Sequence, residues 1–139
     1  MRVYFDTSAM LKLVLQEPGS GTALHAWQAA QAVGAVSILY VEACAGLAAA
    51  RRARRLGPRA HVQSRQDLQM LWASVQVLVP DYPLCDRAAG LAEAESLRGY
   101  DAVHLAAALE YHADVLVCGD GDLLQAGLRR GLGVVDARS

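Results

Sequence analysis

The chain has 139 residues and a mass of 14.8 kDa, and 54% of its residues are hydrophobic, so it can bury the core of one domain spanning residues 1–139. Its formal net charge of −1 neither supports nor excludes a polyanionic partner, because arginines crowd residues 51–65 while acidic residues are spread along the rest. Its cysteines, Cys44, Cys85 and Cys118, form no close pair of the kind that zinc ribbons and redox motifs need, which favours reduced thiols.

Short apolar runs alternate with helix-like segments along the chain. The apolar runs predict strands at residues 2–5, 35–38, 75–79, 114–118 and 133–135. Helical spacing and stop signals predict helices at residues 9–15, from 20 to about 32, from about 40 to 56, around 68–75, 83–98, 101–112, and after Asp120. Ser20 can cap the second helix, and Gly57-Pro58 ends the third. Apolar strands separated by helices predict an α/β protein, a three-layer α/β/α sandwich around a mostly parallel sheet of about five short strands.

Four acidic residues, Asp6, Glu42, Asp101 and Asp120, each follow an apolar run or begin a helix-like one. The carboxyl ends of parallel strands meet at one edge of a sheet, so Asp6 and Asp120 should emerge together, and helix starts can bring the other two there. Crowded carboxylates repel one another, and a divalent cation resolves that conflict. Oxygen ligands alone suit Mg²⁺ or Mn²⁺ rather than zinc. The set therefore predicts metal-assisted hydrolysis of phosphodiester bonds.

A simpler interpretation is that these residues are helix caps. Aspartate is favoured at caps because its carboxylate accepts backbone N–H bonds, and Asp6, Asp101 and Asp120 could each be explained in this way. Capping does not explain Glu42, which follows a predicted strand on a helix with little other charge. The four residues together therefore favour the metal site.

The residues around these acids resemble those of PIN-domain proteins, and of VapC-type toxins in particular. The similar segments are Asp6-Thr7-Ser8-Ala9, Glu42 early in a helix, Tyr100-Asp101-Ala102-Val103-His104-Leu105-Ala106 and Gly119-Asp120-Gly121-Asp122-Leu123-Leu124. The resemblance covers nearly the whole chain. It implies a metal-dependent endoribonuclease that is the toxin of a toxin-antitoxin pair, usually a homodimer, neutralised by a small antitoxin protein. It also implies that Asp6, Glu42, Asp101 and Asp120 are the metal-binding and catalytic residues.

Three further residues are candidates for orienting the acidic set. By position in the family, Ser8 matches a small hydroxyl residue that could orient a carboxylate or a water, and Asp122 is a candidate outer acid. Asp122 could equally be an exposed partner of the helix dipole. His104 lies one turn beyond Asp101 and could contact it, although a histidine on an apolar helix is more often simply packed. Cys118 departs from the family pattern, which often has serine or threonine there.

The arginine-rich stretch offers candidate RNA-binding residues, namely Arg51, Arg52, Arg55 and Arg59. These side chains could form a strip along an RNA backbone. They could also divide between two helices and flank the acidic crevice as phosphate clamps. A solvated surface is an equally good interpretation.

Two other functions compete with the nuclease. The first is a catalytically silent PIN-like module that binds protein or RNA. The second is a receiver or aspartyl phosphatase, which would need a second aspartate beside the first and a lysine across the site, whereas Lys12 is the only lysine. Asp6 stands where a signal peptide needs its apolar segment, and polar residues interrupt the uncharged stretch 19–40, so we expect a cytoplasmic protein without a membrane span.

Overall fold

The computed structural model describes all residues, 1–139, and its centre is a sheet of five parallel strands in the order β3-β2-β1-β4-β5. The strands are β1 Arg2–Phe5, β2 Ala32–Val36, β3 Val75–Leu78, β4 Val115–Cys118 and β5 Gly133–Asp136. The middle strands are the most apolar, and Val3, Tyr4, Phe5, Leu116 and Val117 are fully buried. Continuous burial on both faces is what a parallel sheet between helical layers requires.

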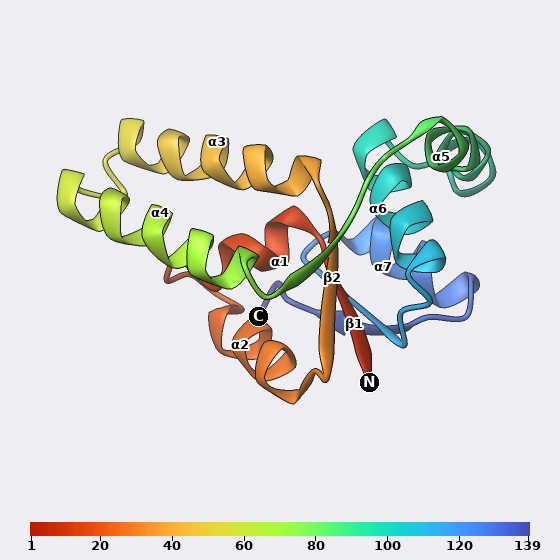
Figure 1. Ribbon diagram of the computed structural model, residues 1–139, viewed down its shortest axis with the longest axis horizontal. Helices are drawn as coiled ribbons and strands as arrows, with labels where there is room; N and C mark the ends of the chain where they lie inside the picture. Colours follow the sequence, from red (N-terminus) through yellow and green to blue (C-terminus); the bar gives the residue numbers. More distant parts are fainter.

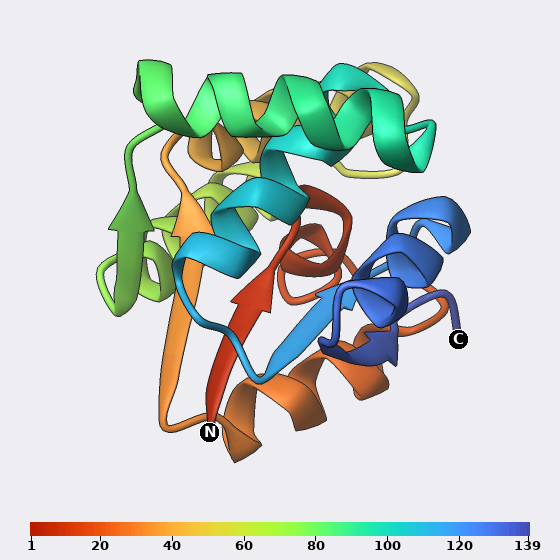
Figure 2. The ribbon, with the colours of Figure 1, turned by 90° about the vertical axis from the view of Figure 1, so that its right-hand side faces the viewer.

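Helices cover both faces of the sheet (Figure 1). On one side lie α1 Thr7–Leu11, α2 Ser20–Ala29, α3 Ile38–Arg52 and α4 Pro58–Trp72. On the other side lie α5 Tyr82–Glu95, α6 Gly99–Glu110 and α7 Gly121–Arg129 (Figures 1 and 2). This arrangement confirms the predicted three-layer α/β/α sandwich. None of these helices has the combination of length and hydropathy needed to span a membrane.

The strand order places a topological switch between β1 and β4. The chain leaves β1 toward β2 and β3 in one direction, then returns to add β4 and β5 on the opposite side of β1. Loops that follow the two strands at such a switch diverge and leave a crevice at the carboxyl edge of the sheet. Asp6 directly follows β1, and Asp120 lies two residues beyond β4. The topology therefore brings these two carboxylates to one crevice.

Several element boundaries differ from the sequence prediction. The helix α4 begins at Pro58, about ten residues before its apolar spacing becomes recognisable. Glu42 lies in the second turn of α3, because that helix begins at Ile38. Ser20 does not cap α2; its hydroxyl accepts the Glu17 N–H and donates to the Leu15 carbonyl. The cap is Gly19, whose φ of 91° brings its Cα so close to the Ala137 carbonyl that a side chain would collide with it.

Candidate functional site

One open hollow at the carboxyl edge of the sheet contains all four predicted acidic residues. Asp6 comes from the end of β1, Glu42 from α3, Asp101 from α6 and Asp120 from the loop after β4. The remaining lining residues are Thr7, Ser8, Leu11, Arg98, Tyr100, His104 and Gly119. Residues separated by more than a hundred positions in the sequence thus share one polar surface.

Asp6 is the most constrained member of the set, with a side chain that caps α1. Its Oδ1 accepts the Ala9 N–H at 2.9 Å, and the Ser8 hydroxyl donates to Oδ1 and Oδ2 at 2.7 and 2.9 Å. Only 4% of the residue is exposed. Burial raises the pKa of Asp6 above the usual range, and His104 and the bonds from Ala9 and Ser8 oppose that shift. The folded chain therefore holds a carboxylate whose charge costs free energy.

Ser8 links Asp6 to the loop beyond β4. While its hydroxyl donates to Asp6, its oxygen accepts the Gly119 N–H at 2.8 Å. A side chain at position 119 would approach that oxygen to 3.2 Å, so glycine keeps the loop close. Cys118 takes no part in this link, because its buried thiol instead points at the Asp120 carbonyl, 3.5 Å away. Ser8 therefore connects the two loops of the crevice.

Glu42 is held by a chain of buried polar groups that begins at Tyr4. The Tyr4 hydroxyl lies 2.8 Å from Nδ1 of His104, and Nε2 of His104 lies 3.4 Å from Oγ1 of Thr7. The Thr7 hydroxyl donates to Oε1 of Glu42 at 2.8 Å. Interaction with His104, and then with Thr7, lowers the pKa of Glu42 despite partial burial. Nε2 of His104 lies 3.7 Å from Oε1 of Glu42, so His104 is near Glu42 rather than bound to Asp101, the contact that the sequence left possible, and it helps to keep Glu42 ionised.

Asp101 and Asp120 face each other across the guanidinium of Arg98. The Nε atom of Arg98 lies 3.4 Å from Oδ2 of Asp101, and its Nη2 lies 3.3 Å from Oδ2 of Asp120. Asp120 also caps α7 by accepting the Leu123 N–H at 3.0 Å. Burial, followed by repulsion from Asp120, raises the pKa of Asp101, and Arg98 opposes the shift. Arg98, Thr7 and Tyr100 also line the hollow, although no motif in the sequence predicts them as site residues.

The donor set of the hollow fits a hard divalent cation. Four carboxylate residues and three hydroxyl residues, Thr7, Ser8 and Tyr100, line it, and burial raises the pKa of two of the carboxylates. No three acidic, histidine or cysteine side chains already form a cage for an ion. Magnesium does not require one, because it is usually held by one or two carboxylates, with waters and substrate oxygens completing the octahedron.

The other predicted residues lie outside the hollow. Asp122 is an exposed residue in the first turn of α7 and does not line the hollow. The arginines are divided between two helices, with Arg51 and Arg52 ending α3 and Arg59 beginning α4. That end of the α3–α4 pair projects away from the sheet (Figure 1). Arg55 is bound to Glu17 at 3.0 Å. The arginines therefore do not flank the acidic crevice.

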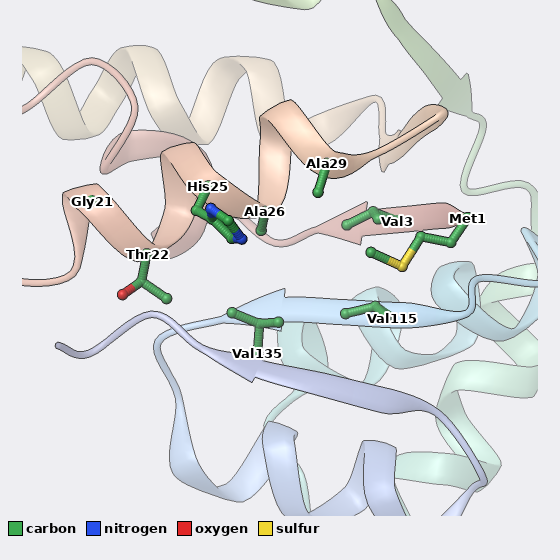
Figure 3. A pocket seen from close by; sticks show the side chains of 9 residues that line it. All are labelled: Met1, Val3, Gly21, Thr22, His25, Ala26, Ala29, Val115 and Val135. Carbon is green, nitrogen blue, oxygen red and sulfur yellow. The ribbon is translucent and has the colours of Figure 1, made fainter.

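A second hollow, of about 350 Å³, lies between α2 and the strands β1, β4 and β5. Figure 3 shows Val3, Ala29, Val115 and Val135 around it, with His25 and Thr22 toward one end. It is similar in size to the acidic hollow of about 320 Å³. Its walls offer no carboxylate, so of the two hollows only the acidic one has the oxygen groups that could hold a cation.

Comparison with known proteins identifies the family. The family description "PIN domain" matches residues 3–128 of the chain. The chain belongs to the PIN-domain family. Ribonuclease VapC45 and ribonuclease VapC49, from two strains of Mycobacterium tuberculosis, are each 38% identical to it over 107 residues, which is 77% of this chain and 74% of each relative.

Solved structures show the same PIN-domain architecture. VapC20 of Mycobacterium tuberculosis, described as a toxin that cleaves the sarcin-ricin loop, superposes with a TM-score of 0.70 at 23% identity, over 90% of this chain and 95% of that one. A toxin-antitoxin complex from Klebsiella pneumoniae gives 0.70 at 21% identity over 97% of both chains. FitAcB from Neisseria gonorrhoeae gives 0.73 at 14% identity, also over 97% of both. At these identities the likeness establishes the fold.

Proposed function

We propose that this PIN-domain protein is a metal-dependent endoribonuclease, a single nuclease domain over residues 1–139 that acts as the toxin of a toxin-antitoxin pair. The observation that carries the proposal is the convergence of Asp6, Glu42, Asp101 and Asp120 on one hollow. The curated relatives named as VapC ribonucleases support the reaction. The solved toxin-antitoxin complexes of the same fold support a small antitoxin as partner.

The role that we propose for each acidic residue follows from its surroundings in the hollow. Asp6, Asp101 and Asp120 would hold Mg²⁺ or Mn²⁺, since a cation offsets the burial that raises the pKa of Asp6 and Asp101 and the repulsion of Asp101 by Asp120. When bound, such an ion lowers the pKa of an attacking water and neutralises charge on the phosphoryl oxygens. Glu42, kept ionised by His104 and Thr7, can join the ligands directly or orient a water beside them.

The experiment that tests the reaction is cleavage of a mixed RNA pool with Mg²⁺, with Mn²⁺ and with chelator. The Asp101→Asn variant should cut at least about 100-fold more slowly, because losing a ligand should cost no less than the 10–100-fold typical of losing a group that only orients one. Asp122→Asn is the matched control, since Asp122 also lies in the first turn of a helix but outside the hollow. Equal rates for Asp101→Asn and the native chain would refute the mechanism.

Growth measurements test the toxin role. Expression of the native chain alone should arrest growth, while the Asp6→Asn form should not, and co-expression of the adjacent antitoxin gene should restore growth. We also propose a homodimer, which light scattering after size-exclusion chromatography would detect. If the native and Asp6→Asn forms allow equal growth, the chain is better explained as a catalytically silent protein-binding or RNA-binding module.

A further inference from the structure

Arg98 occupies the position between two acids where a cation is needed. Its guanidinium reaches Asp101 at 3.4 Å and Asp120 at 3.3 Å, and it lines both the acidic hollow and the adjoining one with Glu42 and Tyr100. Yet 82% of its side chain is exposed to solvent. A side chain so exposed is held at this place by its two carboxylate partners and by little else.

We propose that Arg98 is a tethered counter-cation that a divalent ion displaces, and that the released guanidinium then binds a phosphate of the RNA. The inference rests on the proposed metal-dependent function. In this proposal Arg98 regulates metal entry and then positions the substrate. Its guanidinium binds the two carboxylates before the metal ion enters and a phosphate of the RNA afterwards.

The geometry of the ion pairs makes them easy to exchange. Both nitrogen–oxygen distances exceed those of strong charge-assisted hydrogen bonds, which are about 2.7–2.9 Å. Exposed pairs of this kind contribute little to stability. A divalent ion offers twice the charge to the same two carboxylates, which are 16% and 28% exposed. Metal binding can therefore release Arg98 without disturbing buried structure.

The backbone around Arg98 allows this movement. Arg98 is the cap residue before α6, with extended φ and ψ of −64° and 156°, and its side chain makes no capping hydrogen bond. Its reorientation therefore leaves the helix that carries Asp101 unchanged. The guanidinium fork matches phosphate geometry and lies at the rim of the proposed catalytic hollow, where the RNA backbone must pass.

Metal titration by calorimetry tests the first half of the proposal. The Arg98→Ala variant lacks the guanidinium that competes with the ion, so its dissociation constant for Mn²⁺ should be about three- to fivefold lower than that of the native chain. The matched control is Arg138→Ala. Arg138 lies near Gly121, and the charge of Asp120 helps to raise its pKa, but its guanidinium is bound to Asp136. The control should change Mn²⁺ affinity less than twofold. Equal affinity in the native chain and Arg98→Ala would overturn the proposal, and absence of Mn²⁺ binding in both would overturn the proposed function as well.

Binding of a nuclease-resistant 2′-O-methyl RNA oligonucleotide at several salt concentrations tests the second half. One phosphate contact contributes about 0.7 to the slope of log affinity against log salt for a single strand. The slope should therefore fall by about 0.7 in Arg98→Ala when Mn²⁺ is present, and should match that of the native chain in chelator. An unchanged slope with Mn²⁺, or an equal fall in chelator, would refute displacement of Arg98 by the ion.

Discussion

Asp6 stabilises local structure by capping α1, but burying its negative charge costs free energy. It caps α1 and bonds to Ser8, yet it is the only carboxylate in the buried interior. A group whose pKa is raised by folding contributes stability below its ordinary range, and that contribution is lost as pH rises through the raised value. In the absence of metal, ionised Asp6 therefore weakens the fold toward neutral pH.

The Asp6→Asn variant should be more stable than the native chain in chelator, because asparagine can accept the same cap bond without charge. The gain should grow as pH rises from about 4, the ordinary aspartate range, through the raised pKa of Asp6. Urea unfolding of both proteins at several pH values measures this difference. A gain that is constant with pH would show that charge at Asp6 is not the cause.

Ser8 should matter for both stability and metal affinity. The Ser8→Ala variant leaves the Gly119 N–H without its partner and removes the hydroxyl that bonds both oxygens of Asp6, which then keeps only the Ala9 N–H bond. We therefore expect a loss of about 1–2 kcal/mol in unfolding free energy and about tenfold in Mn²⁺ affinity. Ser64→Ala is the control, since the Ser64 hydroxyl donates to the Val14 carbonyl outside the hollow. It should lose stability but keep Mn²⁺ affinity, and loss of affinity in both variants would exclude a specific role for Ser8.

At the scale of elements, α7 depends on Asp120 for its first turn. The Asp120→Ala variant should lose about 1 kcal/mol because the Leu123 N–H loses its acceptor, whereas Asp120→Asn should retain the cap. Both variants should bind Mn²⁺ weakly. Denaturant unfolding and calorimetry separate the two roles, and equal stability losses in both variants would show that the cap is not responsible.

Elements were predictable from the sequence where local chemistry determines them. Apolar runs located all five strands, and proline and glycine located several helix ends. The first half of α4 was missed because its residues are largely polar and exposed, with no apolar period to detect. The grouping of Asp6 with Asp120 followed from parallel strands, but nothing local marks Arg98, whose role depends on two acids brought together by distant segments.

At the scale of the whole molecule, charge is separated along the structure. The acidic hollow lies at the carboxyl edge of the sheet, and the arginine-rich end of α3 and α4 lies away from it (Figure 1). A net charge of −1 hides this separation. An RNA strand that reached both regions would be drawn by the arginines and cut at a distance from them.

The triple variant Arg51→Ala, Arg52→Ala, Arg59→Ala tests this arrangement. If all three side chains contact phosphates of a long RNA, the slope of log affinity against log salt should fall by about 2. Cleavage of a very short RNA, which cannot span both regions, should be unchanged. Arg87→Ala, on α5 across the sheet, is the control. An unaltered slope in the triple variant would assign these arginines to the solvated surface.

Two of the four acids have a structural role besides the proposed metal binding, and this affects which positions would change if a descendant lost its activity. Asp6 and Asp120 cap helices, so selection for folding alone would keep a capping side chain, aspartate or asparagine, at both positions in a copy of the chain that had lost its enzymatic role. Glu42 and Asp101 cap no helix and would be free to drift. Among diverged descendants, the identity of residues 42 and 101 should therefore separate working enzymes from inherited scaffolds.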